Sequence, residues 1–186
     1  MRKLTILVDM DDTIEQLLNA WIAAVNSKFG TAVTYDDIKS WDVSEAFPGL
    51  SHSDVYDVIM EDDFWDDVKP VPGAADALRR FMDEGHRVYI VTATPYQSVK
   101  PKMEKHLFKY FPFISWDQVI ITSNKHLIAG DVLIDDGVHN LTQGVYRKIL
   151  MDSANNRAFD TSGTDITRVM NWDEAVEAVE TMAAEE

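Results

Sequence analysis

The sequence has 186 residues, of which 46% are hydrophobic and 26% are charged, so it predicts one ordinary globular domain rather than a disordered chain. It contains no cysteine, which excludes a disulfide scaffold, a thiolate metal site and a cysteine nucleophile. There are 32 acidic and 17 basic residues, and the resulting net charge of −15 argues against binding of a nucleic-acid polymer over a broad surface. A small anionic substrate stays possible, because a bound cation can reverse the charge of one pocket.

The hydrophobic segments are too short to cross a membrane. Runs such as Val88–Val91 fall far below the ~20 residues that a spanning helix needs. The apolar stretch Leu4–Val8 is followed at once by acidic residues, which is unlike a secretion signal. We therefore expect a soluble cytoplasmic protein with no membrane partner.

Apolar runs rich in β-branched residues alternate with helical patterns along much of the chain. Such runs are typical of strands buried on both faces of a parallel sheet. They lie at Leu4–Val8, Arg87–Val91, Gln118–Thr122, Asp131–Ile134, Lys148–Met151 and Ile166–Met170. Helices are predicted at Gly73–Glu84, Lys102–Tyr110 and from Asn171 onward. The alternation predicts an α/β fold, a parallel sheet with helices on both faces.

One stretch lacks strand patterns. Residues 15–69 contain apparent helices at Glu15–Phe29, Tyr35–Ser40 and Ser53–Asp62, and the turn Pro70–Gly73 follows them. We therefore expect an α/β core built from residues 1–14 and 70–186, with residues 15–69 inserted after the first strand as a small helical unit. The polar stretch Asp152–Asp165 predicts a loop.

Two carboxylates follow the first predicted strand. Asp9 and Asp11 are two residues apart, so in an extended turn their side chains can share one face. Carboxylates this close repel each other unless a proton or a cation lies between them. An oxygen-rich site with few protein ligands suits Mg²⁺. Capping of a helix start by acidic residues is the plain structural alternative.

Three other predicted strands also end in polar residues. Thr92 can offer a hydroxyl to a phosphate oxygen, Lys125 can supply a positive charge, and Asp135 and Asp136 form a second acidic pair. Each of these features is common alone. Because the carboxyl ends of parallel strands meet at one edge, the combination with Asp9 predicts a metal-dependent phosphoryl-transfer site.

These motifs resemble those of the haloacid dehalogenase superfamily of phosphatases. The pattern Asp-x-Asp-x-Thr is present at residues 9–13, and the strand-end Thr92, Lys125 and the acidic pair 135–136 match the other three motifs. The resemblance implies a Rossmann-like core with a helical cap inserted after the first motif. Phe64-Trp65 and the segment 69–74 make the chain most similar to 5′(3′)-deoxyribonucleotidases. It departs from that family at Asp12, where Gly is usual, and at Ala93, where Ser is frequent.

The resemblance implies a role for each motif. Asp9 is the expected nucleophile that forms an aspartyl-phosphate, and Asp11 is the expected general acid and base. Thr92 and Lys125 are expected to bind phosphoryl oxygens. Mg²⁺ is the expected cofactor, held by the Asp9 carboxylate, the Asp11 backbone carbonyl and Asp135 or Asp136, with Asp136 favoured by resemblance.

The resemblance also implies the substrate class, a deoxyribonucleoside monophosphate. Phe64 and Trp65 are candidates to stack on its base, and packing inside the cap is their alternative role. The other cap aromatics, Trp21, Phe29, Trp41 and Phe47, are expected in the core. The sequence does not predict which base and sugar are preferred or whether the 5′ or the 3′ phosphate is hydrolysed. A homodimer is possible.

Two other functional classes fit parts of the pattern. The same chemistry can serve a sugar or cofactor phosphate. A non-catalytic phospho-receiver or phosphate-binding module also combines an acidic pocket with Thr and Lys, but a receiver carries its phosphorylated Asp on a later strand and lacks the insertion. A degenerate phosphatase that only binds its ligand is disfavoured, because the full residue set is present.

Overall fold

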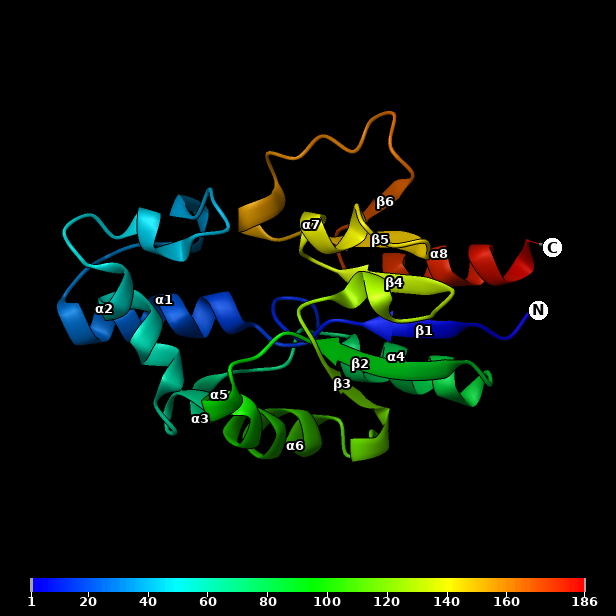
Figure 1. The fold of residues 1–186 in the computed structure, drawn as a ribbon, viewed down its shortest axis with the longest axis horizontal. Coiled ribbons are helices and arrows are strands. Elements are labelled where there is room, and N and C mark those ends of the chain that lie inside the picture. Colours follow the sequence, from blue (N-terminus) through cyan, green and yellow to red (C-terminus); the bar gives the residue numbers. More distant parts are fainter. Residues whose placement is uncertain (1, 186) are drawn as a thin grey trace.

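The computed structural model describes residues 2–185, which form a six-stranded parallel sheet in the order β3-β2-β1-β4-β5-β6 (Figure 1). The strands are β1 (Thr5–Val8), β2 (Arg87–Thr92), β3 (Val119–Ile121), β4 (Val132–Asp135), β5 (Arg147–Met151) and β6 (Ile166–Val169). The six predicted strands are all present, and the predicted α/β class with a Rossmann-like parallel sheet is confirmed. Within the described residues, no helix has the length and hydrophobicity to cross a membrane.

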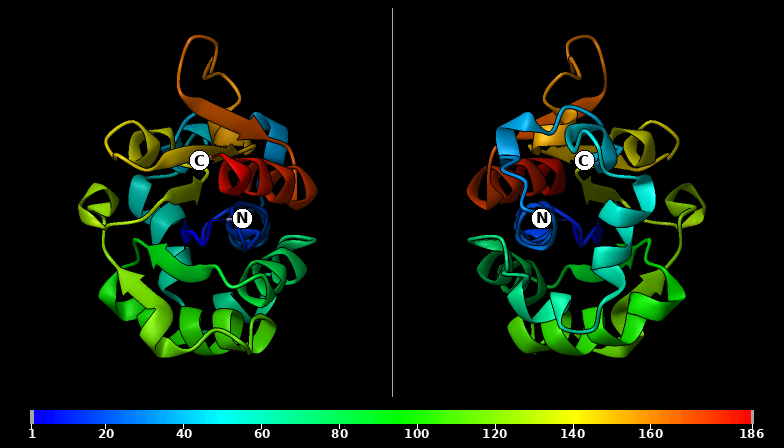
Figure 2. Two further views of the ribbon diagram at one scale, coloured as in Figure 1. Left: turned by 90° about the vertical axis from the view of Figure 1, so that its right-hand side faces the viewer. Right: turned by 90° about the vertical axis from the view of Figure 1, so that its left-hand side faces the viewer.

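Helices cover both faces of the sheet because successive strand residues point to opposite sides. Ile6 and Val8 of β1 belong to a hydrophobic cluster with α4 (Ala74–Asp83) and α8 (Trp172–Ala184). Leu7, which lies between them, belongs to a second cluster together with residues of α7 (Val138–Leu141). Figure 2 shows the two helical layers on either side of the strands. Both faces of β1 are therefore buried, as its continuous apolar run predicts.

The strand order reverses at the centre of the sheet. β1 pairs with β2 on one side and with β4 on the other. In open α/β sheets a crevice forms beyond the carboxyl ends of the strands at such a switch point. Figure 1 shows these ends directed toward the helices of the segment 15–69, while the described ends of the chain lie at the opposite side of the molecule.

The segment 15–69 is helical, and its buried apolar residues form a separate hydrophobic cluster that Ala154 joins from the loop after β5. Its elements are α1 (Leu17–Phe29), η1 (Tyr35–Asp37), η2 (Val43–Ala46), α2 (His52–Tyr56), η3 (Asp57–Met60) and α3 (Phe64–Asp67). The helix predicted at Tyr35–Ser40 is only a 3₁₀ turn, and the one predicted at Ser53–Asp62 is divided between α2 and η3. Capping boxes at Thr34 and Ser51 fix the starts of η1 and α2.

The two connections between this segment and the sheet lie side by side. Gln16 N–H donates to the Lys69 carbonyl at 2.8 Å, and Val71 N–H donates to the Ile14 carbonyl at 2.8 Å. Glu15 and Pro70 form the bridge between these bonds. The segment 15–69 is therefore joined to the sheet through two adjacent, hydrogen-bonded connections.

The helical stretch after β2 is longer and less regular than predicted. It begins at Tyr96 rather than at Lys102, and consists of α5 (Tyr96–Pro101), a π-helical segment η4 (Lys102–Leu107) and α6 (Phe108–Tyr110). Pro101 lies inside the helix and cannot donate a backbone hydrogen bond, and irregular turns often accompany such a break.

Candidate active site

Three carboxylates meet beyond the carboxyl ends of β1 and β4. Asp9 follows β1, and its backbone N–H donates to the Ile134 carbonyl at 2.9 Å, which joins the two strand ends. Asp135 is the last residue of β4 and Asp136 follows it, and one oxygen from each of the three residues lies within 4.8 Å of the others. All three side chains are buried. Such a cluster is stable only with protons or cations close by.

Lys125 supplies one positive charge to this cluster. It lies in η6 (Lys125–Leu127), after β3, and its Nζ is 2.5 Å from Asp9 Oδ1 and 2.7 Å from Asp135 Oδ2. The lysine is 2% exposed. The structure therefore brings together the strand-end segments of β1, β3 and β4.

Asp11 and Thr92 lie next to this cluster, and a second lysine joins them. Lys102 Nζ contacts the Asp11 carboxylate and lies 3.2 Å from Thr92 Oγ1. The Asp11 side chain is not among the three clustered carboxylates and is partly exposed. Sequence reasoning missed Lys102. The available signal was a lysine beside apolar Met103 in a buried helix, where a charge persists only with a partner.

The electrostatics of the site follow from burial of excess negative charge. Burial raises the pKa of Asp9 to about 7 although Lys125 lowers it, and burial and neighbouring carboxylates raise the pKa of Asp136 well above its ordinary value. Burial acts to raise the pKa of Asp11, but Lys102, a hydrogen bond with Glu15 and Lys125 together hold it below its ordinary value. Lys125 keeps its charge, since its two carboxylate partners raise its pKa against the effect of burial. The neighbouring carboxylates therefore differ in their readiness to carry a proton.

The two acids of the pair 135–136 have different surroundings. Asp135 Oδ1 accepts a hydrogen bond from the Gly137 N–H at 2.7 Å, and Asp135 Oδ2 accepts one from Lys125 Nζ. Both oxygens therefore have partners. Asp136 Oδ2 accepts from Asn155 at 3.3 Å, whereas Asp136 Oδ1 is buried and has no partner among the described residues. Asp136 thus has an oxygen free for a ligand, and Asp135 orients Lys125.

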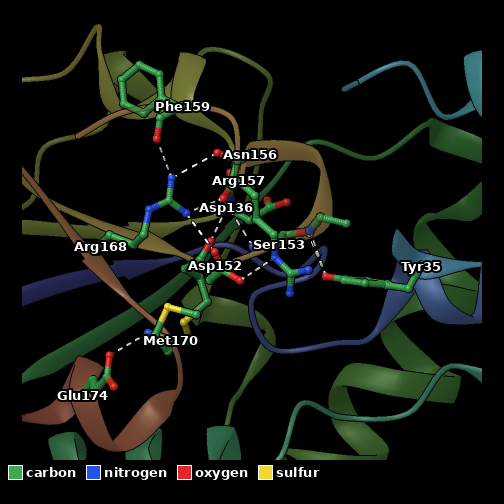
Figure 3. A network of polar contacts seen from close by, with 12 residues as sticks. Tyr35, Asp136, Asp152, Ser153, Asn156, Arg157, Phe159, Arg168, Met170 and Glu174 are labelled. Atoms are coloured by element: carbon green, nitrogen blue, oxygen red, sulfur yellow. Dashed lines mark hydrogen bonds and ion pairs between the residues drawn. The ribbon is translucent and has the colours of Figure 1, made fainter. Parts of the chain in front are cut away.

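The loop that carries Asn155 is anchored by Arg168 (Figure 3). Asn156 donates to the backbone carbonyl of Asp136 at 2.9 Å, and Arg168 donates to Asn156 Oδ1 at 2.7 Å and to the Phe159 carbonyl at 2.9 Å. Residues 153–156, inside the stretch predicted only as a loop, are therefore fixed against the acidic pair. Tyr35 of the segment 15–69 reaches the same loop, since its hydroxyl accepts from the Ala154 N–H at 3.1 Å.

A cavity of about 250 Å³ opens next to Asp11 and Asp136. Its apolar walls come from the segment 15–69, and Ala93, Thr94, Ser98 and Lys102 line the opposite side. The aromatic residues that line it are Trp21, Trp41, Tyr56 and Trp65. Phe64 does not line this cavity and faces a separate groove that is bordered by Ala23 and Lys28. Trp41 is 53% exposed, so the expectation that it lies in the core is wrong.

Asp12, the departure from the usual glycine, has a clear structural role. Its φ of 49° lies in the left-handed region, which aspartate tolerates better than most residues. Its Oδ1 accepts from the Leu18 N–H at 3.1 Å, so it caps α1, where Gln16 provides no side-chain cap. Burial raises its pKa to about 8. Asp12 also lines the cavity, as does Thr94 next to the second departure, Ala93.

Comparison with known proteins places this chain in one family. Residues 2–185 match the family model described as 5′ nucleotidase, deoxy (pyrimidine), cytosolic type C protein. The chain is 34% identical over 174 residues to a 5′(3′)-deoxyribonucleotidase of Bacillus subtilis, covering 92% of this chain and 96% of the relative. It is 31% identical over 175 residues to a 5′(3′)-deoxyribonucleotidase of Clostridium acetobutylicum, covering 94% of each chain.

A solved structure supports the fold independently. A HAD family hydrolase from Deinococcus radiodurans superimposes with a TM-score of 0.64 at 14% identity, over 96% of this chain and 95% of that one. At this identity the likeness concerns the fold alone. Together with the family match, it agrees with the resemblance that the four motifs indicate.

Proposed function

Because the chain belongs to the family of cytosolic type C deoxynucleotide 5′-nucleotidases, a group of phosphate-monoester hydrolases, we propose that it hydrolyses deoxyribonucleoside monophosphates with Mg²⁺ through an aspartyl-phosphate. The observation that carries this proposal is that a buried cluster of charged residues lies next to an aromatic cavity. The buried cluster of Asp9, Asp135, Asp136 and Lys125 suits a phosphoryl group with a cation, and the adjoining aromatic cavity suits a nucleoside.

The residues of the cluster fit a divalent cation. Asp136 Oδ1 is a buried oxygen without a partner among the described residues, and burial, with a smaller effect of Asp135 and Asp11, raises the pKa of Asp9 although Lys125 lies beside it. Carboxylate oxygens are the ligands that Mg²⁺ prefers. Asp9 and Asp136, together with the Asp11 backbone carbonyl, would hold the ion, which would neutralise phosphoryl charge and so allow an anionic nucleophile to approach.

The protein groups then divide the reaction between them. The Asp9 carboxylate attacks phosphorus, the ester oxygen of the nucleoside leaves, and Asp11 gives that oxygen a proton. Asp11 next takes a proton from the water that attacks the aspartyl-phosphate, which releases phosphate and restores Asp9. Lys125 and the Thr92 hydroxyl hold phosphoryl oxygens during both steps. Residues 15–69 act as a cap over this reaction, since they supply the apolar walls of the cavity beside Asp11 and Asp136.

A panel of phosphate esters tests the proposal. With Mg²⁺ present, deoxyribonucleoside monophosphates should be hydrolysed with a kcat/KM at least tenfold above that of ribose 5-phosphate, because only the nucleotides fill the aromatic cavity, and one decade corresponds to about 1.4 kcal/mol. A preference for the sugar phosphate would favour the small-metabolite alternative. A single phosphorylation without turnover would indicate a receiver-like module.

Binding of Mg²⁺ should stabilise the protein more at high pH than at low pH. The raised pKa of Asp9, about 7, exceeds the value of 3.8 for an unperturbed side chain, so the metal-free folded protein holds more protons than the unfolded chain and loses stability as pH rises through 7. Mg²⁺ must displace these protons below pH 7 but not above it. Thermal melts with and without Mg²⁺ should show a larger shift at pH 8.5 than at pH 6. An equal shift at both values would place the ion away from Asp9.

Trp41→Ala should raise KM for deoxynucleotides on the order of tenfold, because stacking of a base on an aromatic ring contributes about 1–3 kcal/mol. The ring is half exposed, contacts His139 edge-on and lines the cavity, so its loss should leave the fold intact. Steady-state kinetics on a deoxynucleotide and on p-nitrophenyl phosphate measure the effect. Exposed Trp116, far along the chain in η5 (Trp116–Gln118), provides the control variant Trp116→Ala. A loss of equal size on both substrates would contradict a base-stacking role.

A further inference from the structure

Lys102 is a buried lysine that none of the four motifs includes. It is 1% exposed, and its Nζ contacts the Asp11 carboxylate, lies 3.1 Å from Glu15 Oε1 and 3.2 Å from Thr92 Oγ1, and lies 5.4 Å from the ring centre of Trp65. A lysine is almost never fully buried unless it is paired. The contacts with Asp11 and Glu15 therefore fix the position of the Lys102 ammonium group between these two side chains.

Glu15 is the second acidic residue that contacts Lys102, in addition to Asp11. Its side chain is fully buried, and its second carboxylate oxygen lies 3.0 Å from His106 Nδ1. Its backbone forms the bridge to Pro70 at the paired connections between core and cap. Lys102 is thus paired with a buried residue at the paired connections and not with a surface group.

The irregular helix brings Lys102 and the His106 ring, whose pKa burial lowers to about 4, to the same side chain, that of Glu15. Lys102 and His106 are four residues apart in the π-helical segment that follows Pro101. Residues at this spacing lie on one side of a helix, and π-helical turns are frequent at functional sites. Both side chains are buried against Glu15, so removal of the irregular turn would move Lys102 relative to Asp11.

Asp11 differs from the other site carboxylates in its orientation. Asp9, Asp135 and Asp136 converge on one point, whereas the Asp11 carboxylate contacts Lys102. An acid that serves the leaving oxygen must be kept away from metal ligation and pointed into the cavity, where Asp11 is a lining residue.

We propose that Lys102, fixed by Glu15 and His106, is a positioning residue that holds the Asp11 carboxylate away from the cluster of Asp9, Asp135 and Asp136 and directed at the leaving oxygen. This inference rests on the proposed function, because it assigns Lys102 a task in the acid–base step of that reaction. Lys102 acts through Asp11 and leaves the binding of the phosphoryl group to Lys125 and Thr92.

A double-mutant cycle between Lys102→Met and Asp11→Asn tests the inference. Lys102→Met should lower kcat on a deoxynucleotide on the order of 10²-fold, the lower range for general acid catalysis, and change KM by less than about threefold. The loss should be smaller on p-nitrophenyl phosphate, whose leaving group departs without a proton. In the Asp11→Asn background, Lys102→Met should cause no further loss. Lys100→Met, on the same helix but exposed, is the matched control and should behave as the wild type.

Three results would overturn the inference. A raised KM, or a further loss in the Asp11→Asn background, would mean that Lys102 contacts the substrate directly, and an unchanged kcat would remove the role altogether. If Lys102→Met does not fold, Glu15→Gln takes its place, and it should show the same selective loss on the poorer leaving group and no further loss beside Asp11→Asn.

Crystal structures of the wild type and of Lys102→Met separate this inference from the proposed function. The Asp11 carboxylate should turn away from its wild-type position in the variant, and an unchanged orientation would contradict positioning by Lys102. This readout does not depend on the substrate. A wild-type protein that hydrolyses no deoxynucleotide would therefore refute the proposed function while the position of Asp11 still decides the role of Lys102.

Discussion

Asp9→Asn should lower turnover of a deoxynucleotide on the order of 10⁴-fold while the protein folds normally, because loss of a nucleophile removes the covalent route and leaves only binding and electrostatic effects. The amide has the shape of the carboxylate and removes one of three buried negative charges, so the stability of the metal-free protein should not fall. Phosphate release in the presence of Mg²⁺ measures turnover, and circular dichroism monitors the fold.

The control for this variant is Asp173→Asn, at an exposed position in the first turn of α8, which should keep wild-type turnover. Near-native turnover of Asp9→Asn with an intact fold would contradict the assignment of Asp9 as the nucleophile. Such a result would require a different acceptor for the phosphoryl group, and no other cluster carboxylate lies at the end of β1.

Lys125→Met should destabilise the metal-free protein by about 3–5 kcal/mol, because breaking a buried ion pair leaves its partner charge uncompensated. Here the lysine faces two carboxylates, Asp9 and Asp135, at 2.5 Å and 2.7 Å. Activity should be lost as well, since the charge that holds the phosphoryl oxygens is gone. Denaturant unfolding with and without Mg²⁺ measures the change.

Mg²⁺ should restore part of the stability lost in Lys125→Met, since the ion and the lysine neutralise the same carboxylates. Lys109→Met, an exposed lysine in α6, should stay within about 0.5 kcal/mol of the wild type. A metal-free Lys125→Met protein as stable as the wild type would show that Lys125 does not balance the buried acids.

Much of the fold and the main cluster could be predicted because both depend on local patterns. Continuous apolar runs predict strands buried on both faces, and polar residues such as Asp9 and Asp135 directly after such runs must lie at the ligand-binding edge of a parallel sheet. The order of the strands is not needed for this argument. It needs only that the strands are parallel and near one another, which the structure bears out.

The contacts around Lys102 could not be predicted, because they depend on the packing of distant segments. Glu15 and Lys102 are separated along the chain by the cap and by three further elements, α4, β2 and α5. The π-helical segment that contains Lys102 has no simple sequence signature. The neighbours Phe64 and Trp65 illustrate the same limit. Both are buried in α3, but only Trp65 lines the cavity, and the choice between them is set by how this short helix packs on α1 and η4.

The central claim is that four strand-end segments surround one phosphoryl group with Asp9 as its acceptor, and trapping the covalent intermediate tests it most directly. The protein should be mixed with Mg²⁺ and a deoxynucleotide, quenched in acid within milliseconds, digested and analysed by mass spectrometry. One phosphoryl group is expected on the peptide that contains Asp9, formed only with Mg²⁺ and absent from Asp9→Asn. Phosphate release with no phosphoryl group on that peptide, or with the group on another residue, would contradict it.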